Sequence, residues 1–202
     1  PMLTMRYTND ELKRLIYESN KMGAYAVYFV DSYGYMTEHD IDRIYELYDK
    51  YLDPEIHIGF HAHNNLDMAF SNARYFMGML QKRNLIVDSC ATGMGQGAGN
   101  LQTELIAHYM NKNFNKKYSL ESILNICDTL EKFRKDEIKM WGYSPIRFVS
   151  AINEAAYKYA VAMKIQYNMP LAEIAHILSA IPYELKQRYT EENLKKVLDG
   201  HI

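Results

Sequence analysis

Short apolar segments alternate with helical segments along the first part of this chain of 202 residues, and this alternation limits the folds available to it. Three apolar runs have the length and composition of strands, at residues 24–32, 55–62 and 85–91. Apolar residues at helical spacing fill the segments around them, at residues 9–23, 37–52, 65–83 and 101–112. Because each helix returns the chain to the same end of the sheet, such strands pair in parallel. The sequence therefore predicts an α/β fold with a parallel sheet, in which residues 2–5 end a further strand.

The tripeptide Val-Asp-Ser occurs twice, at residues 30–32 and 87–89. Each copy stands where a predicted strand gives way to a loop, so both indicate a βα unit with polar groups at the carboxyl end of its strand. Ligands bind at that end in closed barrels and in open parallel sheets alike. We therefore expect the functional site at this end.

The strand pattern stops near residue 118, whereas helical spacing continues through "SLESILNICDTLEKFRKDEI", "SPIRFVSAINEAAYKYAVAMKIQ", "PLAEIAHILSAI" and a charged "EENLKKVLDG". We predict that residues 1–117 form the βα region and that residues 118–202 form a helical C-terminal region.

His61 and His63 stand one residue apart at the end of the second predicted strand. Side chains of a strand alternate between faces, so both imidazoles lie on one face, with Cα atoms about 7 Å apart. At this spacing two ring nitrogens can bind one metal ion. The alternative is a pair of hydrogen-bonded histidines without a ligand, since two ligands alone do not make a metal site.

A glycine-rich loop, "GMGQGAGN" at residues 93–100, follows the last predicted strand. Its backbone can approach a ligand closely and can direct amide groups at an anion. A dinucleotide-binding loop is disfavoured, because Ala98 replaces the third glycine and no acidic residue follows at a next strand end. A tight turn that needs glycine for its backbone is the remaining alternative.

The composition excludes several classes of function. A net charge of −2 offers no basic surface for nucleic acid. No apolar run approaches the roughly 20 residues of a membrane helix. Cys90 and Cys127 lack disulfide-type spacing and no secretory signal precedes them, so we expect reduced thiols in a cytoplasmic protein. The start at Pro1, directly before an apolar run, indicates a piece of a longer protein.

The segments "GFHAHNNLDMAFSNA" and "VDSCATGMGQGAGNLQTE" resemble the carboxyl-terminal half of a family of metal-dependent enzymes with a (β/α)8 barrel. The family includes pyruvate aldolases, 3-hydroxy-3-methylglutaryl-CoA (HMG-CoA) lyase and isopropylmalate synthase. The resemblance covers roughly residues 1 to 115, and the compact glycine loop is most similar to that of the 4-hydroxy-2-oxovalerate aldolases. It implies a partial (β/α)8 TIM barrel followed by the helical region.

The resemblance also implies a metal site. His61 and His63 match the paired metal ligands of the family, and Asn100 matches an asparagine that completes the metal shell in some members. Ligands of this mixed kind suit Mn²⁺ or Mg²⁺ first, and also Zn²⁺ or Co²⁺.

Residues that contact the substrate follow from the same resemblance. Ser32 matches a residue at the keto acid in the aldolases, and His61 would contact the keto acid as well as the metal. Tyr143 of "GYSPIRF" is similar to a tyrosine that reaches over the substrate, although Pro145 departs from the family's segment.

The family's first strand carries an Arg-Asp-Gly segment with a metal-ligating aspartate and a catalytic arginine, and no segment here matches it. We therefore expect about half a barrel, catalytic residues that lie outside this chain, and a chain that is inactive alone. Asp31 and Asp88 stand at strand ends, but we interpret both as hydrogen-bonded structural groups.

The implied reaction cleaves or forms a 4-hydroxy-2-keto acid through a pyruvate enolate, which a divalent metal stabilises as a Lewis acid. An acyl-CoA-dependent synthase or lyase of the same barrel family is one alternative, and a non-catalytic assembly module is another. The open strand edges of half a barrel predict a homodimer, and a helical region that folds over these edges is the alternative. The helical region is similar to the one that contacts a partner dehydrogenase in the aldolases.

Overall fold

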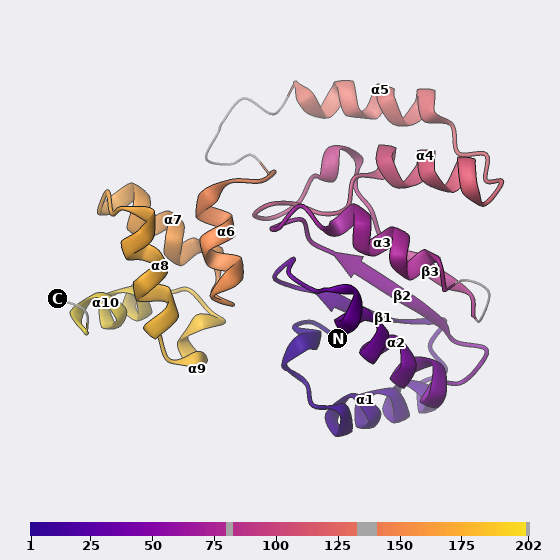
Figure 1. Cartoon of the computed structure of the whole chain (residues 1–202), viewed down its shortest axis with the longest axis horizontal. Coiled ribbons are helices and arrows are strands. Elements are labelled where there is room, and N and C mark those ends of the chain that lie inside the picture. The colour runs from indigo at the N-terminus through magenta and orange to yellow at the C-terminus, as the bar shows by residue number, and fades with distance from the viewer. Residues whose placement is uncertain (80–82, 133–140, 201–202) are drawn as a thin grey trace. The chain divides into compact units, whose positions relative to one another are not determined.

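The computed structural model describes residues 1–79, 83–132 and 141–200 (Figure 1). The chain forms two compact units, Pro1–Gly142 and Tyr143–Ile202, each with its own hydrophobic core. The first unit carries the sheet, and the second is built from helices.

The sheet of the first unit has three parallel strands in the order β1-β2-β3. They are β1 (Ala26–Asp31), β2 (His57–Ala62) and β3 (Leu85–Val87). The predicted parallel α/β fold is confirmed. β3 is shorter than the predicted strand, because Cys90 does not pair with β2. Cys90 forms an isolated parallel bridge with Gln102, which follows the glycine loop.

Helices connect and cover these strands. In the first unit they are α1 (Asn9–Lys21), α2 (Glu38–Tyr51), α3 (Ala69–Met77), α4 (Thr103–Asn113) and α5 (Leu120–Glu131), with 3-10 turns at Thr4–Arg6 and Ala91–Gly93. Thr37 caps α2 through a capping box with Asp40. Thr8 caps α1, because Thr8 keeps an extended backbone and Asn9 is the first helical residue.

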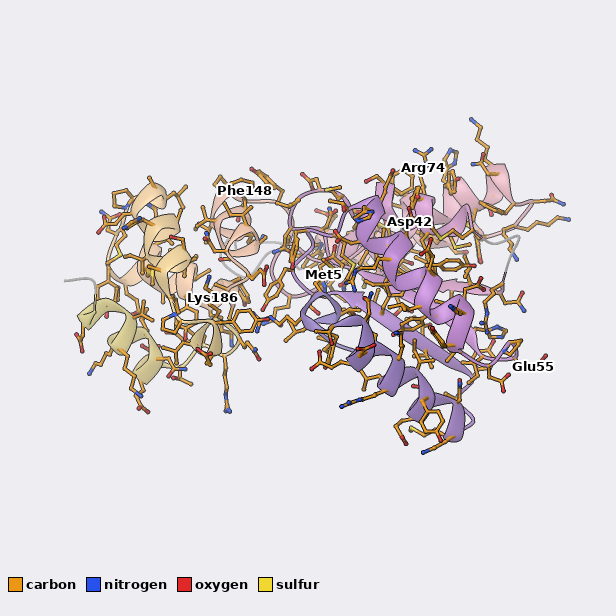
Figure 2. All side chains as sticks on the ribbon, turned by 60° about the horizontal axis from the view of Figure 1, so that its bottom comes forward. Met5, Asp42, Glu55, Arg74, Phe148 and Lys186 are labelled. Atoms are coloured by element: carbon orange, nitrogen blue, oxygen red, sulfur yellow. The ribbon has the colours of Figure 1, made fainter. Side chains whose placement is uncertain are left out.

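Side chains tie neighbouring helices together. Asp42 on α2 and Arg74 on α3 are labelled in Figure 2. The Tyr75 hydroxyl of α3 lies 2.8 Å from both carboxylate oxygens of Asp42. The Arg74 guanidinium lies 5.0 Å from the ring centroid of Tyr109 on α4, in cation–π geometry. These contacts hold α2, α3 and α4 in one layer.

One face of the sheet forms the core with these helices. Phe29 of β1 and Phe60 of β2 stack with ring centroids 4.8 Å apart, and Phe76 of α3 lies 5.4 Å from Phe29. All three side chains are fully buried. Phe60 shares this face with Ile58 and Ala62, so the predicted alternation along β2 is confirmed.

Residues 2–5 were expected to end a strand, and this prediction is wrong. The backbone turns instead into the 3-10 helix Thr4–Arg6, entered through Leu3 with a left-handed φ of 55°. The Thr4 hydroxyl donates to the Pro1 carbonyl and accepts the Val30 N–H, both at 2.8 Å. A side chain thus satisfies an edge N–H of β1 that a neighbouring strand would otherwise bind.

Thr4→Val should destabilise the first unit by about 1–3 kcal/mol, because the buried N–H of Val30 loses its acceptor while the side-chain shape is kept. Denaturant unfolding measures the change. Thr129→Val, on the exposed surface of α5, is the matched control and should stay within about 0.5 kcal/mol of the wild type. Equal effects of the two substitutions would contradict the role given to Thr4.

The second unit is a small helical bundle. Its helices are α6 (Pro145–Ile152), α7 (Tyr157–Gln166), α8 (Leu171–Ala180), α9 (Tyr183–Lys186) and α10 (Glu191–Asp199). Tyr159 lies fully buried in its core, and the Tyr159 hydroxyl lies 2.9 Å from the carbonyl oxygen of Leu185. Across residues 1–79, 83–132 and 141–200, every helix is too short or too polar to cross a bilayer.

The chain divides into its two compact units between Gly142 and Tyr143, whereas the change from strands to helices was predicted between residues 117 and 118. The difference is α5, which packs on α4 within the first unit. The Cys127 thiol of α5 lies 3.7 Å from Glu104 Oε2 of α4. Cys127 and Cys90 are both free thiols, as predicted. The sequence change from strands to helices therefore precedes the end of the first compact unit.

Candidate metal centre

His61 and His63 lie next to each other at the carboxyl end of β2. His61 is the fifth residue of the strand, and His63 follows its last residue. Their ring centroids are 5.0 Å apart, with the ring planes at 70°. The predicted proximity of the two rings is confirmed.

Each ring uses Nδ1 for a hydrogen bond within the protein. His61 Nδ1 lies 3.0 Å from Asp88 Oδ2, and His63 Nδ1 lies 2.7 Å from the carbonyl oxygen of Asp31. A carboxylate and a carbonyl only accept hydrogen bonds, so we assign the proton of each neutral ring to Nδ1. The lone pair of each Nε2 is then left for a ligand, which is the arrangement of metal-binding histidines.

Burial favours the neutral form of His63. Desolvation lowers the pKa of His63, the bond to the Asp31 carbonyl raises it, and the neighbouring His61 lowers it again, with a lower pKa as the result. Neutral imidazole is the form that binds a metal ion. The partly buried ring is therefore ready to bind without first losing a proton at neutral pH.

Asn100 lies beside this pair. It forms an isolated antiparallel β-bridge with His63, and the Asn64 N–H donates to the Gly99 carbonyl at 2.9 Å. The side-chain nitrogen of Asn100 donates to the Met94 carbonyl at 3.0 Å. Because the amide nitrogen is fixed on the loop, its oxygen is the end left for a ligand.

Space requires glycine at three positions of the loop, Gly93, Gly95 and Gly99. A Cβ on Gly99 would lie 2.1 Å from the Gly93 carbonyl oxygen, and Gly99 also has a φ of 85°. A Cβ on Gly95 would lie 2.5 Å from the side-chain nitrogen of Asn100. The glycine at position 95 therefore makes room for the amide that turns back onto Met94.

Residues that the sequence did not single out hold this loop. The indole nitrogen of Trp141 donates to the Thr92 carbonyl at 2.7 Å, and the Gly142 N–H donates to the Ala98 carbonyl at 3.0 Å. From α4, Glu104 accepts the Thr92 N–H at 3.0 Å. Trp141 is the one tryptophan of the chain, and this rarity is the only sequence feature that could have marked it as a functional residue.

Asp31 and Asp88 were interpreted as hydrogen-bonded groups, and both are. Asp31 is buried and accepts the N–H groups of Tyr35 and Met36 at 3.0 Å. Asp88, whose side chain is 45% exposed, accepts from His61. The hydrogen bond of Asp88 also fixes the orientation of the His61 ring.

Asp31 gives the fold a pH dependence. Burial raises the pKa of Asp31 to about 6, although the backbone hydrogen bonds of residues 34–36 oppose the change. Since the folded pKa lies above the unfolded value, the group contributes most stability below about pH 4 and loses it as the pH rises through about 6.

Relative to Asp31→Asn, the wild type should therefore lose roughly 2–3 kcal/mol of unfolding free energy between pH 4 and pH 7. Denaturant unfolding of both proteins across this range gives the difference. The variant removes the titrating group but keeps one acceptor oxygen, so a constant offset between the curves is expected as well. Parallel curves throughout would contradict the raised pKa of Asp31.

Ser32 and Tyr143 have different positions relative to the histidines. Ser32 follows β1 and thus stands at the same end of the sheet, where the Ser32 hydroxyl oxygen accepts the Leu3 N–H at 2.7 Å. Tyr143 begins the second unit and is 54% exposed. The structure thus brings His61, His63 and Asn100 together, whereas the role of Tyr143 stays a prediction.

Carboxylates do not complete the group. Within the described parts of the chain, no three His, Cys, Asp or Glu side chains converge as metal ligands. The candidate donors are therefore two imidazole nitrogens and one amide oxygen.

Proteins named 4-hydroxy-2-oxovalerate aldolase are similar to this chain. That of Thermomicrobium roseum is 42% identical over 90 residues, which are 45% of this chain and 24% of that protein. That of Carboxydothermus hydrogenoformans is 34% identical over 119 residues, which are 57% of this chain and 34% of that protein. The chain thus spans about a quarter to a third of the length of these relatives.

A solved structure gives the same result for the fold. The N-terminal domain of an aldolase-like protein from Bacteroides vulgatus matches with a TM-score of 0.69 at 26% identity, over 83% of this chain and 54% of that one. This similarity agrees with the predicted partial (β/α)8 barrel. The model of the HMGL-like family matches residues 1–130, which include both histidines and the whole glycine loop. The chain therefore belongs to the HMGL-like family.

Proposed function

We propose that this chain provides the metal-binding part of a divalent-metal-dependent aldolase, a lyase that cleaves or forms a 4-hydroxy-2-keto acid. The observation that carries the proposal is the pair of adjacent imidazoles, each with Nδ1 bonded inside the protein and Nε2 left for a ligand. The names of the relatives from Thermomicrobium roseum and Carboxydothermus hydrogenoformans suggest the substrate class.

His61 and His63 would hold the metal through Nε2, and Asn100 through its side-chain oxygen. Nitrogen and neutral oxygen donors fit Mn²⁺ or Mg²⁺, and also Zn²⁺ or Co²⁺. When bound, such an ion supplies a Lewis acid that polarises the carbonyl group of the keto acid. The two Nδ1 hydrogen bonds fix the rings before the ion arrives, which lowers the cost of assembling the site.

Ser32 and Tyr143 would orient the substrate together with His61. The Ser32 hydroxyl already accepts a bond from the Leu3 N–H, so its own proton is free to be donated to a keto-acid oxygen. Tyr143 is exposed and follows Gly142, whose N–H is bonded to the glycine loop. The family resemblance assigns Tyr143 to the substrate, as a phenol that would donate to the small anionic ligand.

The alternatives differ in the second substrate. An acyl-CoA-dependent synthase or lyase of the HMG-CoA lyase or isopropylmalate synthase type would consume a CoA ester, and an assembly module would bind neither. We also propose a homodimer through the open edges of the sheet and a partner dehydrogenase at the second unit.

The chain alone should not turn over 4-hydroxy-2-oxovalerate. Two imidazoles and an amide hold an ion more loosely than a site with a carboxylate, and the described residues offer no third acidic or imidazole ligand. In a coupled assay with Mn²⁺ present, we expect the chain to release pyruvate from 4-hydroxy-2-oxovalerate no faster than the uncatalysed reaction does. Pyruvate release that His61→Ala abolishes would contradict this expectation while leaving the metal role intact.

Binding of pyruvate near the metal tests the proposed function itself. Paramagnetic Mn²⁺ broadens the proton resonances of a molecule held close to it, so the chain with Mn²⁺ should broaden the methyl signal of pyruvate. Lactate, which lacks the keto group, and Mg²⁺, which is diamagnetic, are the controls.

We expect the broadening to disappear in His61→Ala and to persist in His57→Ala, which removes a histidine from the other end of the same strand. Equal broadening in both variants would overturn the proposed site. Broadening of the acetyl-CoA methyl signal without that of pyruvate would favour the synthase.

A further inference from the structure

Residues of β1, of β2 and of the segment after β3 share the sheet face opposite the phenylalanine core. Tyr28 of β1 pairs in register with Gly59 of β2, and His61 stands two residues further along β2. Asp88 follows β3, and its N–H donates to the Phe60 carbonyl at 3.1 Å, which continues the register. By the alternation of strands, Tyr28, Gly59, His61 and Asp88 all lie on this face.

Gly59 gives the ring of Tyr28 its room. A Cβ on Gly59 would lie 2.4 Å from Cδ1 of Tyr28, so any other residue would displace the ring. Gly59 has no left-handed φ, so its backbone does not require glycine, and space is the reason for it. The Tyr28 ring therefore lies across β2, in the direction of β3 and Asp88.

The carboxylate of Asp88 stands between two donors. Its Oδ2 atom lies 3.0 Å from His61 Nδ1. Burial raises the pKa of Tyr28, and the charge of Asp88 and a hydrogen bond with it raise that pKa further. Carboxylate oxygens accept hydrogen bonds, so the His61 imidazole donates to Asp88, and the Tyr28 phenol, whose ring lies across Gly59 in the direction of β3, faces the same carboxylate.

We propose that Tyr28 is a positioning residue of the candidate metal centre: it holds Asp88, and Asp88 holds the His61 ring with Nδ1 protonated and Nε2 presented to a ligand. The inference rests on the proposed function for the identity of that ligand. His63 differs from His61 in one respect, because a backbone carbonyl fixes its Nδ1 and no side-chain substitution removes that acceptor. His63 is therefore an internal control within the same site.

The tautomer of His61 in the metal-free full chain tests the proposal directly. Long-range ¹H–¹⁵N spectra at pH 8, where free imidazole is neutral, distinguish Nδ1–H from Nε2–H rings. The signals of the chain's seven histidines are assigned with His61→Gln and His63→Gln.

We expect an Nδ1–H ring for His61 in the wild type and a large Nε2–H population in Asp88→Asn, whose carboxamide can donate to Nδ1. Tyr28→Phe should give an intermediate population, and His63 should not change. Tyr25→Phe, which alters an exposed tyrosine of the segment before β1, is the matched control. A wild-type His61 with the proton on Nε2, or a Tyr28→Phe spectrum equal to the wild type, would overturn the proposal.

Manganese affinity gives a second readout on the same proteins. Asp88→Asn should weaken binding about 10-fold to 100-fold, the usual effect of losing the partner of a metal-binding histidine. Tyr28→Phe should weaken it about 2-fold to 10-fold, as expected for one hydrogen bond. If the tautomers shift as expected but the wild type does not bind Mn²⁺, the positioning role holds and the proposed function fails. If Mn²⁺ binds tightly and Tyr28→Phe changes neither readout, the function stands and the positioning role is wrong.

Discussion

Replacing His63 with alanine should weaken Mn²⁺ binding by more than about 100-fold. Loss of only the hydrogen-bond partner of a metal-binding histidine already lowers metal affinity about 10-fold to 100-fold. His63 is the ring held most firmly in the candidate centre: it is partly buried, its Nδ1 is bonded at 2.7 Å, and its backbone pairs with Asn100. His61→Ala should have an effect of the same order. Titration of free Mn²⁺ by its electron paramagnetic resonance signal gives the affinity.

His57→Ala is the matched control for both variants. His57 lies at the other end of β2, where its ring contacts Tyr25 at 4.6 Å between centroids. Its loss should leave Mn²⁺ affinity unchanged within about twofold, well below the effect of a lost hydrogen bond to a charged group. If all three alanine variants bind Mn²⁺ equally, the ion is held elsewhere and the candidate centre is wrong.

Phe60→Ala should lower the unfolding free energy of the first unit by about 3–5 kcal/mol, the cost of removing a large aromatic side chain from a closed core. Phe60 is fully buried, stacks on Phe29 and lies 5.6 Å from the ring of Phe76. The void would open directly beside His61 on the same strand, so Mn²⁺ binding should weaken along with stability.

Hydrogen exchange followed by mass spectrometry separates the two cores in this experiment. Peptides from β1, β2 and α3 should lose protection in Phe60→Ala, whereas peptides of α7 and α8 should not, because their core is a separate cluster. Tyr17→Ala, at a 60% exposed position of α1, should leave both sets of peptides close to the wild type. Protection lost equally in both units by Phe60→Ala would contradict the description of two independent cores.

The sequence predicted the part of the site that depends on strand periodicity. A period of two puts His61 and His63 on one face, and the order of strands and helices puts their ends at one edge of the sheet. The link from His63 to Asn100 came from the family resemblance and agrees with the β-bridge between them. A local pattern of four residues, from Thr37 to Asp40, is likewise enough to identify Thr37 as the cap of α2.

Interactions between distant segments could not be predicted from the sequence. The bond from His61 to Asp88 needs the register of β2 against β3, and the bond from Trp141 to Thr92 joins residues 49 positions apart. Thr4 was taken for part of a strand because its hydroxyl replaces a strand partner in a way that no local pattern reveals. The compact units divide after Gly142 and not where the strand pattern stops, because helical spacing does not tell whether α5 packs on α4 or on later helices.

Anomalous diffraction at the manganese absorption edge, from crystals of the chain grown with Mn²⁺, tests the central claim most directly. We predict one strong anomalous peak about 2.0–2.3 Å from Nε2 of both His61 and His63, with the side-chain oxygen of Asn100 as the third protein ligand. The Nδ1 atoms should keep their bonds to Asp88 and to the Asp31 carbonyl. A peak on the carboxylate of Asp88, or no peak within reach of the two histidines at saturating Mn²⁺, would contradict the assignment of this site as the metal centre.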